Sequence, residues 1–197
     1  MNLKKLLFAA VIVLSANATF AQDTKIATHL LNINIPQVAL LDLEAPSTAI
    51  TLAGTVPTEA GLPMTFEDAT AKNTSIWMNY SSIVKGVLLR NVTVSILTGS
   101  VPAGLKLTVL AGEASSDGAG TKGTAASIIT FINTTPTTAQ NIVTGIGSTY
   151  TGDGVNKGRN LTYQLGYATD AATDYAALRN VDLVGVPLTI TYTLSDI

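Results

Sequence analysis

The residue types that most often carry out chemistry are few in this sequence, and their spacing forms no recognisable catalytic motif. The chain of 197 residues has a single histidine, His29, and no cysteine, which leaves no ligand set for a histidine- or thiolate-based zinc site. No serine lies in the G-x-S-x-G pattern of a nucleophile elbow, and a Ser-His-Asp arrangement of distant residues is left open. Glu67 and Asp68 are adjacent, so on a strand they would point to opposite faces and could not flank a sugar bond. We therefore expect that the protein is not an enzyme.

The aromatic residues Trp77 and Tyr80 are the candidate ligand-binding residues. Flat rings can stack against a sugar, and this is the only tryptophan of the chain. The two residues are three positions apart, so on a strand they face opposite sides and one of them belongs to the core. A buried tryptophan is the ordinary arrangement in a β-sandwich.

One glycine-rich stretch, residues 118–123, matches the G-x-G-x-x-G spacing of dinucleotide-binding loops. That chemistry requires a helix after the glycines, whose N-terminus holds the pyrophosphate. Here the next residues, 124–131, favour a strand. We therefore expect a mobile loop over residues 112–123 and no bound cofactor.

A second glycine-rich stretch, residues 150–158, offers the side-chain oxygens of Asp153 and Asn156. Calcium takes six to eight oxygen ligands, and the D-x-[DN]-x-[DN] ladder that often supplies them is absent. The sequence favours a turn and predicts no metal site, with calcium binding by the loops 112–123 and 145–158 left open.

Residues 1–21 have the three parts of a secretory signal peptide. Two early lysines are followed by an apolar stretch, residues 6–14, and by Ala21 at the expected cleavage position. The mature chain, residues 22–197, then has 9 basic and 13 acidic residues, a formal net charge of −4, which argues against a nucleic-acid partner. Later apolar runs are too short for a transmembrane helix. We expect the protein to be secreted, at the cell surface or in the periplasm.

Alternation of apolar and polar residues dominates the mature chain. It is clearest in residues 92–96, 105–109 and 188–194, where every second residue is apolar, as in strands with one buried face. Further strands are expected at residues 29–35, 49–53, 75–80, 126–132, 161–165 and 181–184, and a short helix at 171–178. Turn residues separate these segments. The pattern predicts one all-β domain, a single immunoglobulin-like antiparallel β-sandwich of about 8–10 strands.

The turn between two of the clearest strands has Pro102 two residues before Gly104, which suits a tight reversal. We therefore expect residues 90–111 to form a β-hairpin.

The late strand at residues 161–165 and the closing strand at 188–194 resemble secreted bacterial pilin-like domains, in particular spore coat protein U-like domains. The resemblance covers mainly residues 145–197. It implies an immunoglobulin-like sandwich whose groove takes a strand from a neighbouring subunit, and no catalytic residues. The cysteines of that family are absent here.

Residues 24–35 are apolar at Ile26, Leu31, Ile33 and Ile35, and two roles fit them. An open sheet edge can be completed by a strand from another chain, so the segment could be donated to a second copy. It could equally be the first strand of its own sandwich, which we favour because sequential strands usually pair.

These observations favour an exported, non-catalytic structural or adhesive surface protein, such as a fimbrial subunit. Its expected partners are copies of itself, joined through edge strands, or other surface proteins. The alternatives are a carbohydrate-binding module that uses the Trp77 region, an outer-membrane barrel and a hydrolase.

Overall fold

The computed structural model describes residues 25–46, 49–132, 138–179 and 187–197. The chain divides into two units, residues 1–35 and residues 36–197. In the first unit, residues 25–35 form neither helix nor strand, and their side chains are exposed. The prediction of a strand at residues 29–35, the first of the sandwich, is therefore wrong. The first strand that joins the sheet is the next segment along the chain, β1 (Val38–Glu44), which pairs with β2 (Lys72–Ile83). The predicted signal peptide lies outside the described residues.

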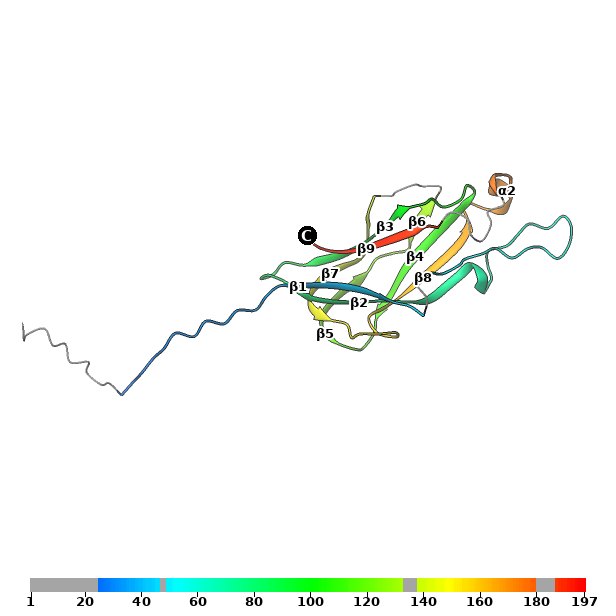
Figure 1. Ribbon diagram of the computed structural model, residues 1–197. Coiled ribbons are helices and arrows are strands. Elements are labelled where there is room, and N and C mark those ends of the chain that lie inside the picture. Colours follow the sequence, from blue (N-terminus) through cyan, green and yellow to red (C-terminus); the bar gives the residue numbers. More distant parts are fainter. Residues whose placement is uncertain (1–24, 47–48, 133–137, 180–186) are drawn as a thin grey trace, which may run out of the picture. The chain divides into compact units, whose positions relative to one another are not determined.

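The second unit is an all-β domain in which the described residues form nine antiparallel strands (Figure 1). The remaining strands are β3 (Arg90–Thr98), β4 (Leu105–Ala114), β5 (Ala119–Ala125), β6 (Ile129–Ile132), β7 (Gln140–Tyr150), β8 (Arg159–Tyr167) and β9 (Thr189–Asp196). Their order is β6-β4-β8-β2-β7-β3-β9, with β1 on β2 and β5 on β7.

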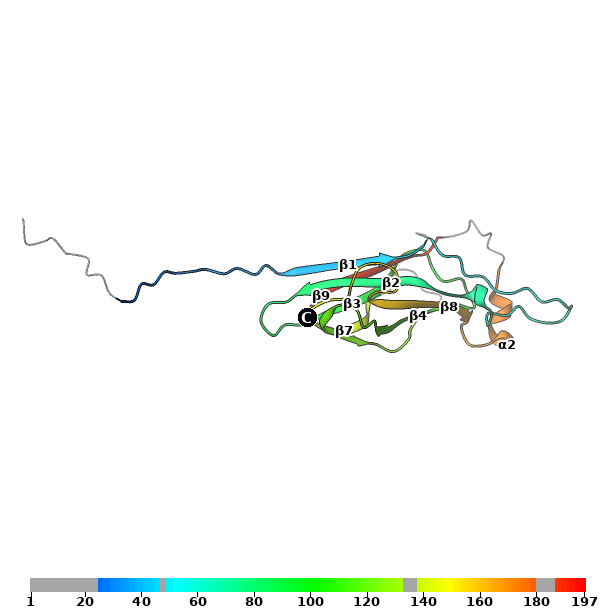
Figure 2. The ribbon, with the colours of Figure 1, turned by 90° about the horizontal axis from the view of Figure 1, so that it is seen from below.

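Strand β2 joins two layers of this sheet. Its second part, from Trp77 to Ile83, pairs with β1, which runs beside it in Figure 2, and its first part, from Lys72 to Met78, pairs with β8. Its last residues, Ser81 and Ser82, pair instead with Tyr150 and Thr149 of β7. One layer is therefore β6-β4-β8-β2-β1 and the other is β5-β7-β3-β9, as expected of a β-sandwich.

The core lies between these layers and follows the alternation of the sequence. The three clearest strand predictions are confirmed in β3, β4 and β9. In β3 and β4 every second side chain is buried, because alternate residues of a strand point to the same face. The buried apolar residues of these two strands are Val92, Val94, Ile96, Leu105, Leu107, Val109 and Ala111.

The predicted hairpin at residues 90–111 is wrong. The tight turn exists, since the Leu105 amide donates to the Pro102 carbonyl oxygen at 3.1 Å. However, β3 pairs with β7 and β9, whereas β4 pairs with β6 and β8. Val101, at the start of the turn, is buried, so the chain passes over the edge of the core and enters the other layer. The apolar faces of β3 and β4 thus line the same core from different layers.

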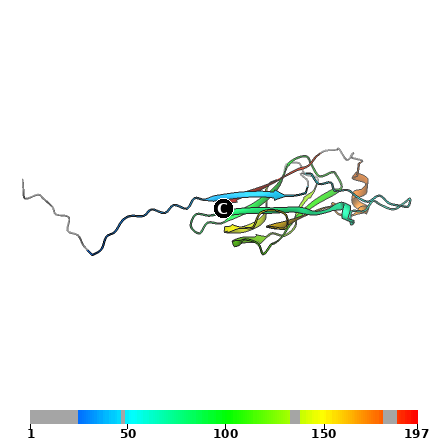
Figure 3. The same cartoon turned by 60° about the horizontal axis from the view of Figure 1, so that its bottom comes forward.

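Several weaker predictions have mixed outcomes. Strands are confirmed at 75–80 and 161–165, and for the last part of 126–132, and the helical turn at 171–178 is confirmed as α2 (Ala171–Asp174) followed by the 3-10 turn η3 (Tyr175–Ala177). The predicted strand at 49–53 is wrong. This segment leads into a long loop, residues 53–70 (Figure 3). The Ala53 amide donates to the Thr70 carbonyl, Thr55 forms a β-bridge with Thr65, and the end of the loop overlaps the 3-10 turn η2 (Ala69–Ala71). The predicted strand at 181–184 lies outside the described residues. No helix among the described residues is long and apolar enough to cross a membrane.

Candidate interaction surface

A buried arginine, Arg159 at the start of β8, holds four strands together. Its Nε donates to the Tyr80 hydroxyl at 3.0 Å, its Nη1 to the Gly112 carbonyl at 2.9 Å, and its Nη2 to the Gly123 carbonyl at 2.6 Å and the Lys122 carbonyl at 3.2 Å. The Tyr80 hydroxyl in turn donates to the Lys122 carbonyl at 2.6 Å. Burial raises the pKa of Tyr80, and the adjacent guanidinium partly offsets this rise. Because these groups satisfy one another inside the core, we assign them a structural role.

The structure places the two candidate aromatic residues on opposite faces of β2. Tyr80 is buried in the core, whereas Trp77 is half-buried on the other face, in register with Glu44 of β1 and Asn160 of β8. The core ring is thus the tyrosine rather than the tryptophan, and the two rings share no surface. A ligand role for Trp77 stays a prediction.

The stretch at 112–123, predicted as a mobile loop, is mostly strand. β4 continues to Ala114, and β5 pairs with β7 from Ala119 onward. The glycines make this pairing possible: Gly118 has φ +76°, and a Cβ there would lie 1.9 Å from the Tyr150 carbonyl oxygen. The G-x-G-x-x-G spacing therefore reflects a close approach of two backbones and not a phosphate loop.

The end of β4 also meets the loop at 150–158. Lys157 Nζ lies 2.6 Å from Asp117 Oδ1, and the Ser115 amide donates to the Gly158 carbonyl at 2.7 Å. The hydrogen bond from the Lys157 ammonium group lowers the pKa of Asp117. Within the described residues no group of three histidine, aspartate or glutamate side chains comes together.

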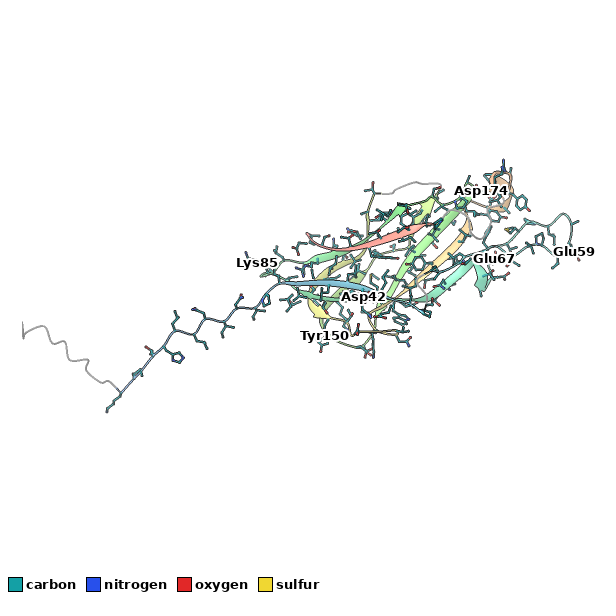
Figure 4. All side chains as sticks on the ribbon, viewed as in Figure 1. Asp42, Glu59, Glu67, Lys85, Tyr150 and Asp174 are labelled. Carbon is teal, nitrogen blue, oxygen red and sulfur yellow. The ribbon has the colours of Figure 1, made fainter. Side chains whose placement is uncertain are left out.

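The remaining residues considered for catalysis are dispersed. His29 is exposed in residues 25–35, and Glu67 and Asp68 are exposed at the end of the long loop. Two other carboxylates labelled in Figure 4, Asp42 on β1 and Asp174 on α2, lie on different elements from Glu67.

Strand β9 is an edge strand of the sandwich, and it contacts β1 of the other layer. It pairs with β3 from Thr189 to Asp196, and with no other strand among the residues that the structure describes. Its inward side chains Ile190, Tyr192 and Leu194 pack against the core but are only partly buried. The Tyr192 hydroxyl lies 2.6 Å from the Tyr163 hydroxyl of β8, and burial raises the pKa of both phenols.

One end of the sandwich exposes an apolar surface, which we call the apolar end surface. It consists of Ile83, Val87, Leu88, Leu89 and Ile197. The Leu88 amide donates to the Lys85 carbonyl to close the turn, and the Ile197 amide donates to the Leu89 carbonyl at 3.2 Å. Val87 is 96% exposed and Ile197 is 66% exposed, so neither contributes to the core.

A second buried arginine, Arg90 of β3, lies beneath this surface. Its Nε forms an ion pair with Asp196 of β9 at 2.6 Å, and its Nη1 donates to the Ser82 hydroxyl at 3.1 Å and to the Val38 carbonyl of β1. Arg90 therefore fixes the start of β1 and the end of β9 at the same end of the domain.

The comparisons with known proteins give no relative: no family model, no curated protein and no solved structure matches this chain. The functional interpretation therefore depends on the residues and surfaces described above.

Proposed function

We propose that this chain is an exported, non-catalytic structural protein of the cell surface that assembles with copies of itself by strand addition. Residues 25–35 of one copy, which we call the tail, would add to the edge of β9 in a second copy. The single observation that carries the proposal is the segment itself, an extended, apolar stretch that forms no strand and precedes an otherwise complete sandwich.

The tail has the composition of a strand with one buried face. Leu31, Ile33 and Ile35 are 71%, 80% and 70% exposed, and Asn32 and Asn34 alternate with them. In an extended chain alternate side chains share a face. Three large apolar side chains would then enter the core of the acceptor, while the asparagines would face water.

The β9 edge has a matching alternation. Its partly buried residues Ile190, Tyr192 and Leu194 face the core, and two threonines lie between them. An edge strand presents free N–H and C=O groups that an incoming strand can satisfy, and side-chain alternation then selects the register. A strand added here would place its apolar side chains beside the half-exposed ones of β9.

The test compares two single substitutions in the mature chain, residues 22–197. Ile33→Asp puts a carboxylate on the apolar side of the tail, and the matched control Asn34→Asp puts it on the polar side. We expect concentration-dependent oligomers or fibres for the unmodified chain and for Asn34→Asp, and monomers for Ile33→Asp, by sedimentation velocity and negative-stain microscopy. A monomeric unmodified chain at high concentration, or equal assembly of both variants, would refute strand addition by the tail.

A further inference from the structure

We propose that the apolar end surface of each copy packs against the copy that accepts its tail. The contact would be a second, side-chain interface, separate from the added strand. This inference rests on the proposed function, and it assigns a partner, a second copy of this chain, to exposed apolar residues that the fold does not use.

The first argument is the length of the connection. Only Pro36 and Gln37 separate Ile35, the last apolar residue of the tail, from Val38, the first residue of β1. An extended chain advances at most about 3.6 Å per residue, so three steps cover roughly 10 Å. The acceptor of the tail must therefore lie within this distance of the start of the donor's β1.

The second argument is the stiffness of the connection. Proline fixes its own φ near −65°, and it restricts the preceding residue to extended conformations. Ile35 and Pro36 therefore limit the directions in which the tail can leave the domain. A stiff, short connection holds the two copies in one relative orientation, which is what a defined side-chain interface requires.

The third argument is what surrounds the start of β1. Val38 pairs with Ile83. Arg90 donates to the Val38 carbonyl and forms an ion pair with Asp196, the last residue of β9, which Ile197 follows. The apolar end surface thus lies at the point where the tail departs. A copy held within about 10 Å of this point would cover Val87, which is 96% exposed.

The other candidate partner for the apolar end surface is a lipid membrane, since exposed apolar patches also mark membrane interaction sites. Lys85, labelled in Figure 4, is the one charged residue between Ile83 and Leu89. The expected net charge of −4 for the mature chain opposes approach to an anionic membrane. Two copies of the same negative charge also repel each other, so the choice of a second copy as the occupant rests on the short connection through Pro36 and Gln37 and not on net charge.

The experiment introduces Val87→Asp into the mature chain, with Val87→Leu and Val155→Asp as controls. Val155 is also exposed in a loop but lies outside the apolar end surface. We expect Val87→Asp to raise the concentration for half-assembly at least about tenfold, because a charge replaces a buried apolar side chain, whereas both controls assemble as the unmodified chain does. Thermal unfolding should be unchanged, because Val87 makes no core contact.

Two further measurements separate the possible failures. A labelled peptide of residues 25–35 should bind Ile33→Asp, whose own tail is inactive, and should bind the double variant Ile33→Asp, Val87→Asp with the same affinity, since the acceptor edge is intact in both. Normal assembly of Val87→Asp would overturn the end-surface contact and leave strand addition in place. Loss of peptide binding by the Ile33→Asp chain would overturn strand addition itself. Binding of the unmodified chain to neutral phosphatidylcholine vesicles, lost in Val87→Asp, would assign the surface to lipid and overturn the proposal.

Discussion

The four hydrogen bonds of Arg159 predict a large penalty for a substitution that keeps the charge, Arg159→Lys. The acceptors are the Tyr80 hydroxyl and three carbonyl oxygens that belong to β4 and β5, and the planar guanidinium reaches them in different directions. A lysine ammonium is a point charge on a flexible stem and cannot reproduce this fork. The Tyr80 hydroxyl and the Lys122 carbonyl keep their mutual hydrogen bond, so the Gly112 and Gly123 carbonyls are the two acceptors that we expect to lose their side-chain donor. Each buried acceptor left unsatisfied costs roughly 1–3 kcal/mol, so the free energy of unfolding should fall by about 2–6 kcal/mol.

The assay is thermal unfolding followed by circular dichroism, at a concentration where the chain is monomeric. For a domain of this size 1 kcal/mol changes Tm by about 2–4 °C, so Arg159→Lys should lower Tm by at least about 4 °C. The matched control is Arg179→Lys, because Arg179 is exposed and its hydrogen bonds within the described residues go to the carbonyls of nearby Ala176 and Leu178. A Tm for Arg159→Lys as close to the unmodified value as that of Arg179→Lys would refute the structural role of the guanidinium.

Two more predictions concern stability. Burial raises the pKa of Tyr163 to about 12 and that of Tyr192 further, so both phenols stay protonated in the folded chain at pH values where they ionise in the unfolded chain. Their contribution to the free energy of unfolding is complete below about pH 10 and is lost as pH rises toward the folded pKa values. Chemical denaturation should therefore show a steeper loss of stability from pH 9 to 11.5 in the unmodified chain than in Tyr192→Phe, and equal slopes would contradict the burial of that phenol. Gly118→Ala should destabilise the domain by more than Gly145→Ala, since both glycines have φ near +75° but only Gly118 has a carbonyl oxygen in the space of a new Cβ; equal melting temperatures would argue against the close approach of β5 and β7.

The sequence predicted the strands whose alternation is regular and failed where another strand decides the structure. Residues 92–96 and 105–109 were predictable because their burial alternates with period two. β1 was not predicted, because its apolar residues Val38, Ala39, Leu40 and Leu41 are consecutive and do not alternate with polar ones; in this edge strand the side chains are only partly buried or exposed. β5 is rich in glycine and has no strand propensity of its own, and it becomes a strand because β7 offers its backbone.

The pairing of strands was harder to predict than their existence. A turn such as Pro102 to Leu105 is compatible with a hairpin and with a crossing between layers. The choice depends on whether two apolar faces lie side by side or face to face, which the local residues do not encode. The placement of Trp77 and Tyr80 on opposite faces followed from their spacing, but which ring is buried depended on Arg159, whose guanidinium binds the tyrosine hydroxyl.

The burial of the two arginines could have been predicted from the alternation of residues along their strands, although not from composition. Arg159 lies two and four residues before the buried Leu161 and Tyr163 of its strand, and Arg90 lies two and four residues before the buried Val92 and Val94. Because alternate residues of a strand point to the same face, both guanidinium groups are directed toward the core. A charged residue that continues the inward series of a strand must find several acceptors, because burying it without them is too costly. The two-residue alternation of each strand could therefore have identified both arginines as buried and predicted that they join strands.

Arg90 holds the edge strand β9 in place beside the proposed assembly surface, in a sandwich that has no disulfides. Arg90 belongs to β3 and binds the first residue of β1, a serine of β2 and the last residue of β9, so it connects the two layers where β1 begins. If strand addition transmits force between copies, the load on the tail passes through Pro36 and Gln37 to Val38, which the Arg90 guanidinium anchors. The ion pair with Asp196 at the same end ties the proposed acceptor strand to the donor's point of departure. The buried Arg90 side chain thus supports both roles proposed for this end of the molecule, because it anchors the start of β1, from which the donated tail extends, and the end of β9, the proposed acceptor strand.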